Sequence, residues 1–141
     1  MHTTPTQNKY NWIRELLQQD PSVFKAGTWR QGYEELMEPQ LRQIQLASNE
    51  YVLTKQQQQQ APEHLKQRYD KRLHVIKERL CDLAEVYESL YHFIEDIIGS
   101  LYVEYKAVAV AKNREIAEWQ QLHDSMYELA VKQTEKLLGK S

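Results

Sequence analysis

The chain has 141 residues, of which 41% are hydrophobic and 27% charged, and its formal net charge is −2 at pH 7. A mean hydropathy of −0.75, with no run of 18 apolar residues, excludes a membrane-spanning helix. Three tryptophans, nine tyrosines and regularly spaced aliphatic residues exclude a disordered chain. The single cysteine, Cys81, cannot form an intramolecular disulfide, and the first ten residues do not resemble a secretory signal, so we expect a cytoplasmic protein.

Residues 1–27 are expected to form a flexible tail, a short helix and a loop. Tyr10, Ile13, Leu16 and Leu17 have the spacing of an amphipathic helix over residues 8–19. Pro21 follows, and because the residue before a proline is disfavoured in helical geometry, the helix should end at Asp20.

A second helix is predicted over residues 28–60. One side of it carries most of the apolar residues: Tyr33, Leu36, Met37, Leu41, Ile44, Tyr51 and Val52. Pro39 lacks a backbone N–H, so we expect the helix to be kinked or split there. Pro62 marks the clearest break in the chain, since proline suits the first position of a new helix.

Residues 62–138 are predicted to form one long helical segment. It contains no proline after Pro62 and only one interior glycine, Gly99. At 100° per residue the apolar residues from Leu65 to Leu137 fall on one side, and the phase does not slip at Gly99. Breaks at 99–100 or at 112–114 are the alternatives. The fold class that follows is all-α: a long-helix bundle or an antiparallel coiled-coil-like assembly.

The apolar band is widest between Leu83 and Tyr105, where it covers about half of the helix circumference. A two-stranded coiled coil needs a narrower band, so this segment should contact more than one neighbouring helix. Core packing is the simpler interpretation of such a stripe. We assign the same residues as the protein-interaction surface: Leu83, Tyr87, Leu90, Ile94, Ile97, Leu101 and Tyr105.

Charge alternates along this segment: residues 66–79 are mainly basic, 82–104 acidic, 106–114 basic and 115–128 acidic. Folding the segment antiparallel about Gly99 would place opposite charges together. Two arrangements achieve this, a hairpin that turns at Gly99-Ser100 and a continuous helix paired with a second copy. The hairpin would expose Ile94, Ile97 and Leu101 at its tip, whereas the dimer would bury them, so we favour the continuous helix and an antiparallel homodimer.

The basic block could instead contact phosphate groups. It contains six bases, Lys66, Arg68, Lys71, Arg72, Lys77 and Arg79, and only two acids, Asp70 and Glu78. The acidic block beside it would repel a nucleic-acid backbone. Nucleic-acid binding is therefore the second hypothesis, and a partner-facing helix surface is favoured.

A polar stripe opposite the apolar band contains possible metal ligands: His74, Glu78, Cys81, Glu85, Glu88, His92 and Asp96. Because these side chains should face solvent, we expect a solvated surface and no metal; a small helical metalloprotein is the third hypothesis. His123 lies inside the apolar arc and is expected to be a hydrogen-bonded core histidine. No catalytic triad, zinc pattern or phosphate loop occurs, and no cofactor is expected.

These features predict a non-enzymatic helical interaction protein. It would act as a scaffold, adaptor, inhibitor or accessory subunit, through helix-on-helix packing with a protein partner and through self-association. The identity of the partner does not follow from the residues.

Overall fold

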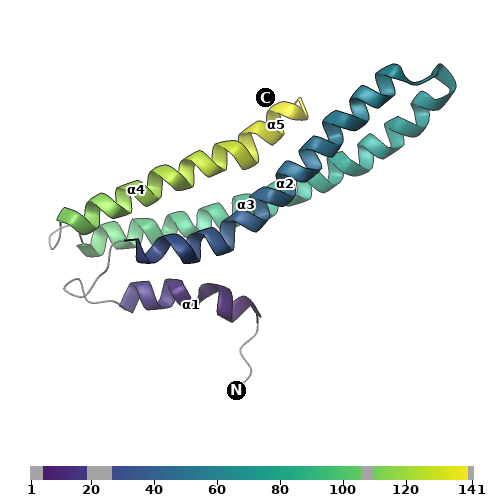
Figure 1. Cartoon of the computed structure of the whole chain (residues 1–141). Coiled ribbons are helices and arrows are strands. Elements are labelled where there is room, and N and C mark those ends of the chain that lie inside the picture. The colour runs from purple at the N-terminus through teal and green to yellow at the C-terminus, as the bar shows by residue number, and fades with distance from the viewer. Residues whose placement is uncertain (1–4, 19–26, 106–109, 140–141) are drawn as a thin grey trace. The chain divides into compact units, whose positions relative to one another are not determined.

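The computed structural model describes residues 5–18, 27–105 and 110–139, and every regular element in these ranges is helical, with no strand (Figure 1). The predicted all-α fold class is thus confirmed. The principal helices are α1 (Pro5–Gln18), α2 (Thr28–Gln60), α3 (Lys66–Tyr105), α4 (Val110–Tyr127) and α5 (Gln133–Leu137). A 3₁₀ turn, η2 (Glu63–Leu65), precedes α3, and a π-helical turn, η3 (Glu128–Lys132), joins α4 to α5. Within the described ranges, no helix is long and apolar enough to cross a membrane.

The two long helices pack antiparallel and differ in part from the boundaries expected from the sequence. α2 contains Pro39 in its interior, so it is one helix and is not split there. It ends at Gln60, and Pro62 caps η2, in agreement with the expected break. α1 begins at Pro5, inside the segment that we expected to be a tail.

The chain divides into two compact units, and α2 and α3 each contribute to both. The first unit comprises residues 1–39 and 90–125, and the second comprises residues 40–89 and 126–141. In the described part of the first unit, α1, the start of α2, the end of α3 and most of α4 supply the core. In the second, the rest of α2 pairs with the start of α3, and the C-terminal residues supply a third segment.

In the first unit, α3 and α4 run antiparallel. The Tyr91 hydroxyl donates a hydrogen bond to the Asp124 carboxylate (2.8 Å), and the Asn113 side-chain amide donates to the Tyr105 carbonyl oxygen (3.1 Å). In one straight helix, residues 91 and 124 would be about 50 Å apart. The predicted continuous helix over 62–138 is therefore wrong.

α3 ends at Tyr105, and α4, which begins at Val110, runs antiparallel to it, so neither of the two breaks that we considered is present. Gly99 is inside α3 and residues 112–114 are inside α4, while 106–109 lie outside the described residues. A later reversal leaves the isoleucines of α3 beside the chain's own α4, so Ile94 and Ile98 are fully buried without a second copy. Tyr91 also lies beside Asp124 instead of the basic residues that a turn at Gly99 would place there. Neither the burial of these isoleucines nor the pattern of charges therefore favours an antiparallel dimer any longer.

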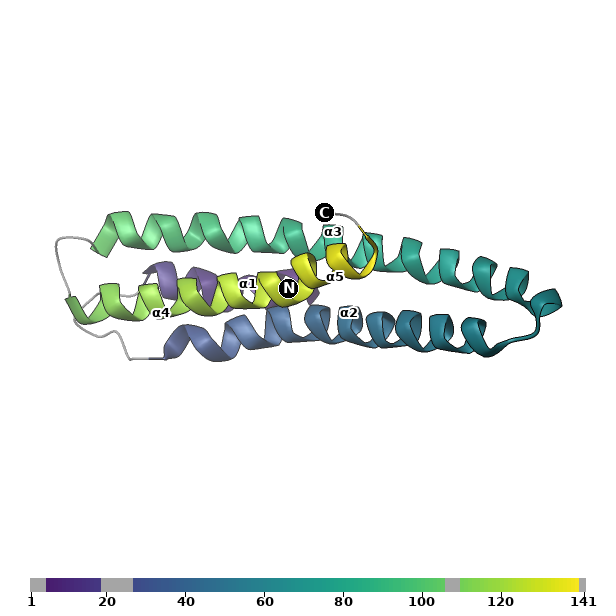
Figure 2. The same cartoon turned by 90° about the horizontal axis from the view of Figure 1, so that it is seen from above.

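The core of the second unit is a coiled-coil-like seam. Its buried residues recur at spacings of three, four or seven: Ile44, Ala47, Tyr51 and Thr54 in α2, and Leu73, Ile76, Leu80 and Tyr87 in α3. Two polar contacts fix the pairing, Glu50 with Arg72 (3.7 Å) and the Gln58 amide with Asp70 (2.6 Å). Figure 2 shows these parts of α2 and α3 running side by side as far as the connection at 61–65.

In the first unit, α1 approaches α2 closely at a glycine. A Cβ atom built on Gly32 would overlap the indole ring of Trp12, whereas a Cβ on Gly99 would have no atom within 4 Å. Neither glycine has a positive φ, so neither is required by its backbone conformation. Gly32 is needed for close packing and Gly99 is not.

Alanine at these two glycines should therefore change stability in opposite directions. Gly99→Ala is expected to raise the free energy of unfolding by about 0.5–1 kcal/mol, because alanine is the better helix former. Gly32→Ala is expected to lower it by about 1–3 kcal/mol, because the overlap with Trp12 must displace α1. Urea denaturation followed by circular dichroism measures both. A stabilised Gly32→Ala variant would show that α1 does not pack on α2 in this way.

Candidate functional site

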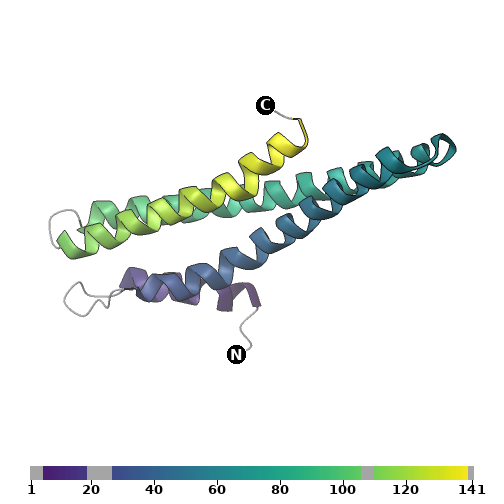
Figure 3. The same ribbon diagram turned by 45° about the horizontal axis from the view of Figure 1, so that its top comes forward.

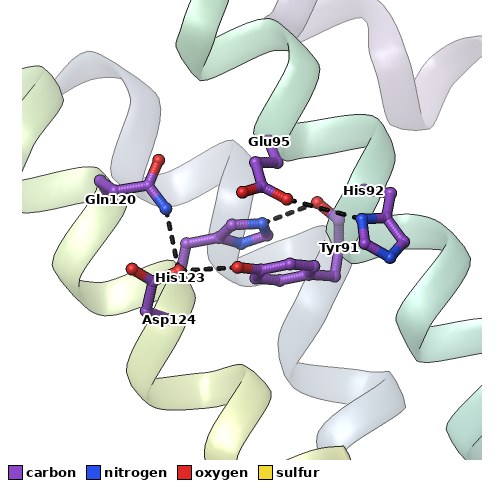
Figure 4. A network of polar contacts seen from close by, with 6 residues as sticks. All are labelled: Tyr91, His92, Glu95, Gln120, His123 and Asp124. Atoms are coloured by element: carbon purple, nitrogen blue, oxygen red, sulfur yellow. Dashed lines mark hydrogen bonds and ion pairs between the residues drawn. The ribbon is translucent and has the colours of Figure 1, made fainter.

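His123 of α4 is the centre of a buried polar network in the first unit. It is fully buried, its Nδ1 lies 2.9 Å from the Tyr33 hydroxyl, and its Nε2 lies 2.8 Å from the Tyr91 carbonyl oxygen. A carbonyl oxygen only accepts, so Nε2 carries the proton, and Nδ1 accepts from the Tyr33 hydroxyl. Figure 4 shows the imidazole parallel to the Tyr91 ring; their centroids are 4.2 Å apart. The network thus links α2, α3 and α4.

This environment favours the neutral imidazole. Burial lowers the pKa of His123 below its ordinary value of 6.5, and His92 acts in the same direction. The hydrogen bond to the Tyr91 carbonyl and the carboxylates of Asp124 and Glu95 oppose this effect. The desolvation of the charged form is the largest of these contributions, so His123 titrates at a lower pH than an exposed histidine.

The network continues into an aromatic cluster that contains all three tryptophans. Trp119 of α4 stacks on Trp29 at the start of α2, with centroids 5.2 Å apart, and lies 5.8 Å from Trp12 of α1. The Tyr33 ring meets Trp119 edge-on at 6.0 Å and also contacts His123. These rings join α1, α2 and α4.

Two charged residues of α4 are buried beside these rings. Lys112 is 4% exposed, and its ammonium lies 4.2 Å from the centre of the Tyr105 ring, a cation–π distance. Glu115 is 9% exposed and accepts a hydrogen bond from the Gly27 backbone N–H, just before α2 begins. The space enclosed between them is about 10 Å³, which is no larger than one water molecule. The first unit therefore has no room here for a substrate.

The predicted interaction residues of α3 are mainly core residues of this chain. Tyr87, Ile94, Ile97, Leu101 and Tyr105 are buried, and Leu83 and Leu90 are partly covered. Their role in binding another protein stays a prediction, but most of these side chains are already covered by the chain's own helices. His123 is the hydrogen-bonded core histidine that the sequence predicted.

Large apolar side chains are exposed on one side of the second unit. Four of them lie on the side where Glu50 meets Arg72, on the outer flanks of the helix pair: Leu46 (63% exposed) and Leu53 (54%) point away from α3, and Val75 (64%) and Val86 (49%) point away from α2. The C-terminal residues occupy the opposite flank of α3, where Val131, Thr134 and Leu138 lie against Cys81, Ala84 and Glu88. Within the second unit, Figures 2 and 3 show no C-terminal helix beside α2 and α3 near the 61–65 connection. We call this side the hairpin face.

Arginines of α3 also lie on the hairpin face. At 100° per residue, Arg68, Arg72 and Arg79 fall between the seam and Val75, whereas Lys66 and Lys77 fall on the other flank and Lys71 lies on the outer side of α3. Arg68 and Arg72, with Leu65 and Tyr69, line a shallow hollow of about 260 Å³. The structure thus does not place the six bases of the predicted nucleic-acid surface on one face: three arginines lie on the hairpin face, and the three lysines point in other directions.

These arginines are poorly neutralised by the chain itself. Arg72 is 3.7 Å from Glu50, whereas no carboxylate of the described residues forms an ion pair with Arg68 or Arg79. Lys66, on the other flank, pairs with Glu63 at 3.3 Å. Arg68 and Arg79 are therefore the arginines of the hairpin face that lack an ion pair within the described residues, whereas Glu50 partly neutralises Arg72.

Most residues of the polar stripe of α3 are exposed, and Cys81 and Glu88 are half-buried. His74 is 3.1 Å from Glu78 and His92 is 3.5 Å from Glu95, both within one helix turn. Among the residues that the structure describes, no group of three or more His, Cys, Asp or Glu could hold a metal ion. His74 and His92 thus form local surface pairs, whereas Cys81 and Glu88 are partly covered and lie against the C-terminal residues.

Sequence reasoning did not identify the residues of the hairpin face. Leu46, Leu53 and Val75 lie outside the seam positions, so they were not assigned to any surface. The available signal was the seven-residue spacing of Leu46 and Leu53, which places two leucines on one line beside the core. Their exposure depends on which flank the C-terminal segment covers.

Comparisons of the chain with protein-family models, with curated proteins and with solved structures give no match.

Proposed function

We propose that this chain is a non-enzymatic helical interaction protein that binds a protein partner by helix-on-helix packing on its hairpin face. The observation that supports this proposal is the gathering of Leu46, Leu53 and Val75, each more than half exposed, on one side of the α2–α3 pair. Single exposed leucines are ordinary, but several large apolar side chains exposed on one side of a helix pair are typical of an interface. Scaffold, adaptor, inhibitor and accessory subunit are roles that such a surface serves.

The location of the partner surface differs from the one expected from the sequence. The band of α3 is largely used by the chain's own core, whereas the hairpin face is available without unfolding. A cytoplasmic location, which the lone Cys81 favours, remains part of the proposal. Self-association also remains part of it, with the hairpin face as the surface that a second copy would use.

A photo-crosslinking amino acid at Leu46 or Val75 tests the proposal in cells that make the protein. We expect one protein adduct of discrete mass from either position, because both side chains would lie under the partner helix. Substitution of Leu53 by aspartate should reduce the adduct at least about tenfold, since it places a charge in the apolar contact. The matched control is Val52→Asp, an adjacent exposed residue outside the hairpin face.

Val52→Asp should leave the adduct unchanged. Equal loss in both variants would mean that aspartate disturbs α2 itself, which circular dichroism would detect. Absence of any adduct from Leu46 and Val75, with the chain folded, would contradict a docking role for the hairpin face.

Nucleic-acid binding is the weaker alternative. The bases of the 66–79 block do not share one face, and apolar side chains flank the arginines on the hairpin face. A gel-shift assay at two salt concentrations examines it directly, since phosphate contacts weaken steeply with salt. The metalloprotein hypothesis has no ligand group among the described residues to support it.

A further inference from the structure

We infer that α1 is an autoinhibitory strap: within its own chain it occupies a groove of the first unit that binds an amphipathic helix of a partner protein with the same apolar spacing. The groove is lined by the start of α2, the end of α3 and α4. This inference does not depend on the hairpin face, which lies in the second unit. It is carried by the contacts that α1 makes and by the polar groups that it covers.

α1 is seated in the groove by side chains on one of its sides. Trp12 rests on Gly32, where any larger residue would overlap its ring. Ile13 and Leu16 are each 5% exposed, and Leu16 closes a small space against aromatic rings of α2 and α4. The groove thus has a recess for an aromatic ring and, one helix turn further on, a site for an aliphatic side chain.

The contacts that hold α1 are apolar. Among the side chains of α1 that the structure describes, none forms a hydrogen bond or ion pair with α2, α3 or α4. The opposite side of α1 carries Asn11, Arg14, Glu15 and Gln18, which are exposed. Because apolar contacts are not directional, the groove selects a helix by the spacing of its apolar side chains and by nothing that is unique to α1.

The closed arrangement leaves buried polar groups without partners. The indole N–H groups of Trp12, Trp29 and Trp119 are buried and have no acceptor among the described residues. The rings of Trp29 and Trp119 lie against α1, so its departure would bring water to all three donors. An unpaired buried donor costs a free energy similar in size to the contribution of one buried aliphatic side chain. This cost offsets much of the gain from burying the apolar side of α1, which is therefore held less firmly than the other helices.

A partner helix fits the open groove better than the α1 of a second copy. α1 is joined to α2 through residues 19–27, so within its own chain it competes at an effective concentration on the order of mM. The α1 of a second copy offers the same contacts at a lower concentration and loses this competition. A partner helix that also supplies an acceptor to the indole N–H groups gains contacts that α1 lacks. The strap thus keeps weaker helices out of the groove.

Hydrogen–deuterium exchange of the full-length protein tests whether α1 opens separately. The amides of α1 should exchange at least about tenfold faster than those of α4. A disulfide clamp provides the control: Trp12→Cys/Gly32→Cys, in a Cys81→Ser chain, joins two positions that are in direct contact. Oxidation should slow the exchange of α1 at least about tenfold, and reduction should restore it. Exchange of α1 as slow as that of α4 before oxidation would overturn the strap.

A fluorescent peptide with the sequence of residues 5–18, stapled between the exposed positions 14 and 18, serves as the helix from outside. In the released full-length variant Ile13→Asp/Leu16→Asp, the chain's own α1 carries charges that the groove excludes. In fluorescence anisotropy, the peptide should bind this variant at least about tenfold more tightly than the wild type. Asn11→Asp/Gln18→Asp places the same charges on the exposed side of α1 and should bind the peptide no more tightly than the wild type does.

Two glycine substitutions in the released variant locate the peptide. Gly32→Ala should weaken its binding at least about tenfold, because the added methyl group fills the recess for the tryptophan ring. Gly99→Ala, where a Cβ meets no atom within 4 Å, should leave binding unchanged. Leu53→Asp should also leave it unchanged, which separates this groove from the hairpin face.

The contrary outcomes are distinct. Failure of the peptide to bind the released variant, equal binding to the wild type, or binding unaffected by Gly32→Ala would overturn the groove. Unfolding of α2, α3 and α4 in the released variant and also in the milder Ile13→Ala/Leu16→Ala would show that α1 is part of the core and not a strap. A doubled mass of the wild type in light scattering that the oxidised clamp returns to the monomer would identify the α1 of a second copy as the occupant and overturn the partner helix.

Discussion

Replacement of Trp119 by alanine is expected to lower the free energy of unfolding by about 3–5 kcal/mol, the largest effect of any single substitution proposed for this chain. Trp119 is 1% exposed and stacks on Trp29, and it also touches Trp12 and Tyr33. Its removal leaves a cavity where α1, α2 and α4 meet, and rings carried by three helices cannot all move to fill it. Urea denaturation followed by far-ultraviolet circular dichroism measures the loss.

Two variants provide the controls. Trp119→Phe should cost much less, because a ring remains and because the buried Trp119 indole N–H has no acceptor among the described residues. Val103→Ala, at a side chain that is 80% exposed on α3, should change stability by less than about 0.5 kcal/mol. A loss of under about 1 kcal/mol in Trp119→Ala would show that the aromatic cluster is not packed as described.

His123→Phe should destabilise the protein and remove a pH dependence that the wild type shows. A phenyl ring fills the site but can neither accept the hydrogen bond of the Tyr33 hydroxyl nor donate one to the Tyr91 carbonyl oxygen, at a cost of about 1–3 kcal/mol. The coupling is measurable in a double-mutant cycle. Tyr33→Phe should cost less in the His123→Phe background than in the wild type, because its hydroxyl has already lost this partner.

The pH dependence follows from the lowered pKa of His123. Between that lowered value and 6.5, the unfolded chain binds a proton that the folded chain does not, so the free energy of unfolding rises with pH. The full stabilising contribution of His123 is present above pH 6.5, and it is lost as the pH falls from 6.5 to the lowered pKa of His123. Chemical denaturation from pH 7.5 to 5 should show the fall in the wild type and in the exposed-site control His74→Gln, and a smaller fall in His123→Phe. Equal slopes in all three would contradict a neutral, buried His123.

Both substitutions act on the first unit, whereas the hairpin face belongs to the second. Leu46, Leu53 and Val75 are exposed, and their substitution should alter binding with little change in stability. Trp119 and His123 are buried, and their substitution should alter stability. This contrast gives a direct check that the binding variants act on the surface, because they should keep the unfolding midpoint of the wild type.

The sequence by itself determined the all-helical class and most of the residues that enter the core. Periodicity identified α2 and the apolar residues of α3, and Pro62 marked the break before η2, because these features depend on neighbours within a few residues. It also placed His123 inside the apolar arc, and the structure shows that imidazole hydrogen-bonded to Tyr33 and Tyr91.

Only the tertiary structure decided where the chain reverses and which surface stays open. The residues around 106–109 contain neither glycine nor proline, and the apolar phase of α4 continues that of α3, so periodicity could not reveal a reversal there. Its place is set by contacts such as that of Tyr91 with Asp124, between residues 33 apart in sequence. Likewise, Leu46 and Val75 form a surface because the C-terminal segment covers the other flank of α3, and such a choice depends on long-range packing.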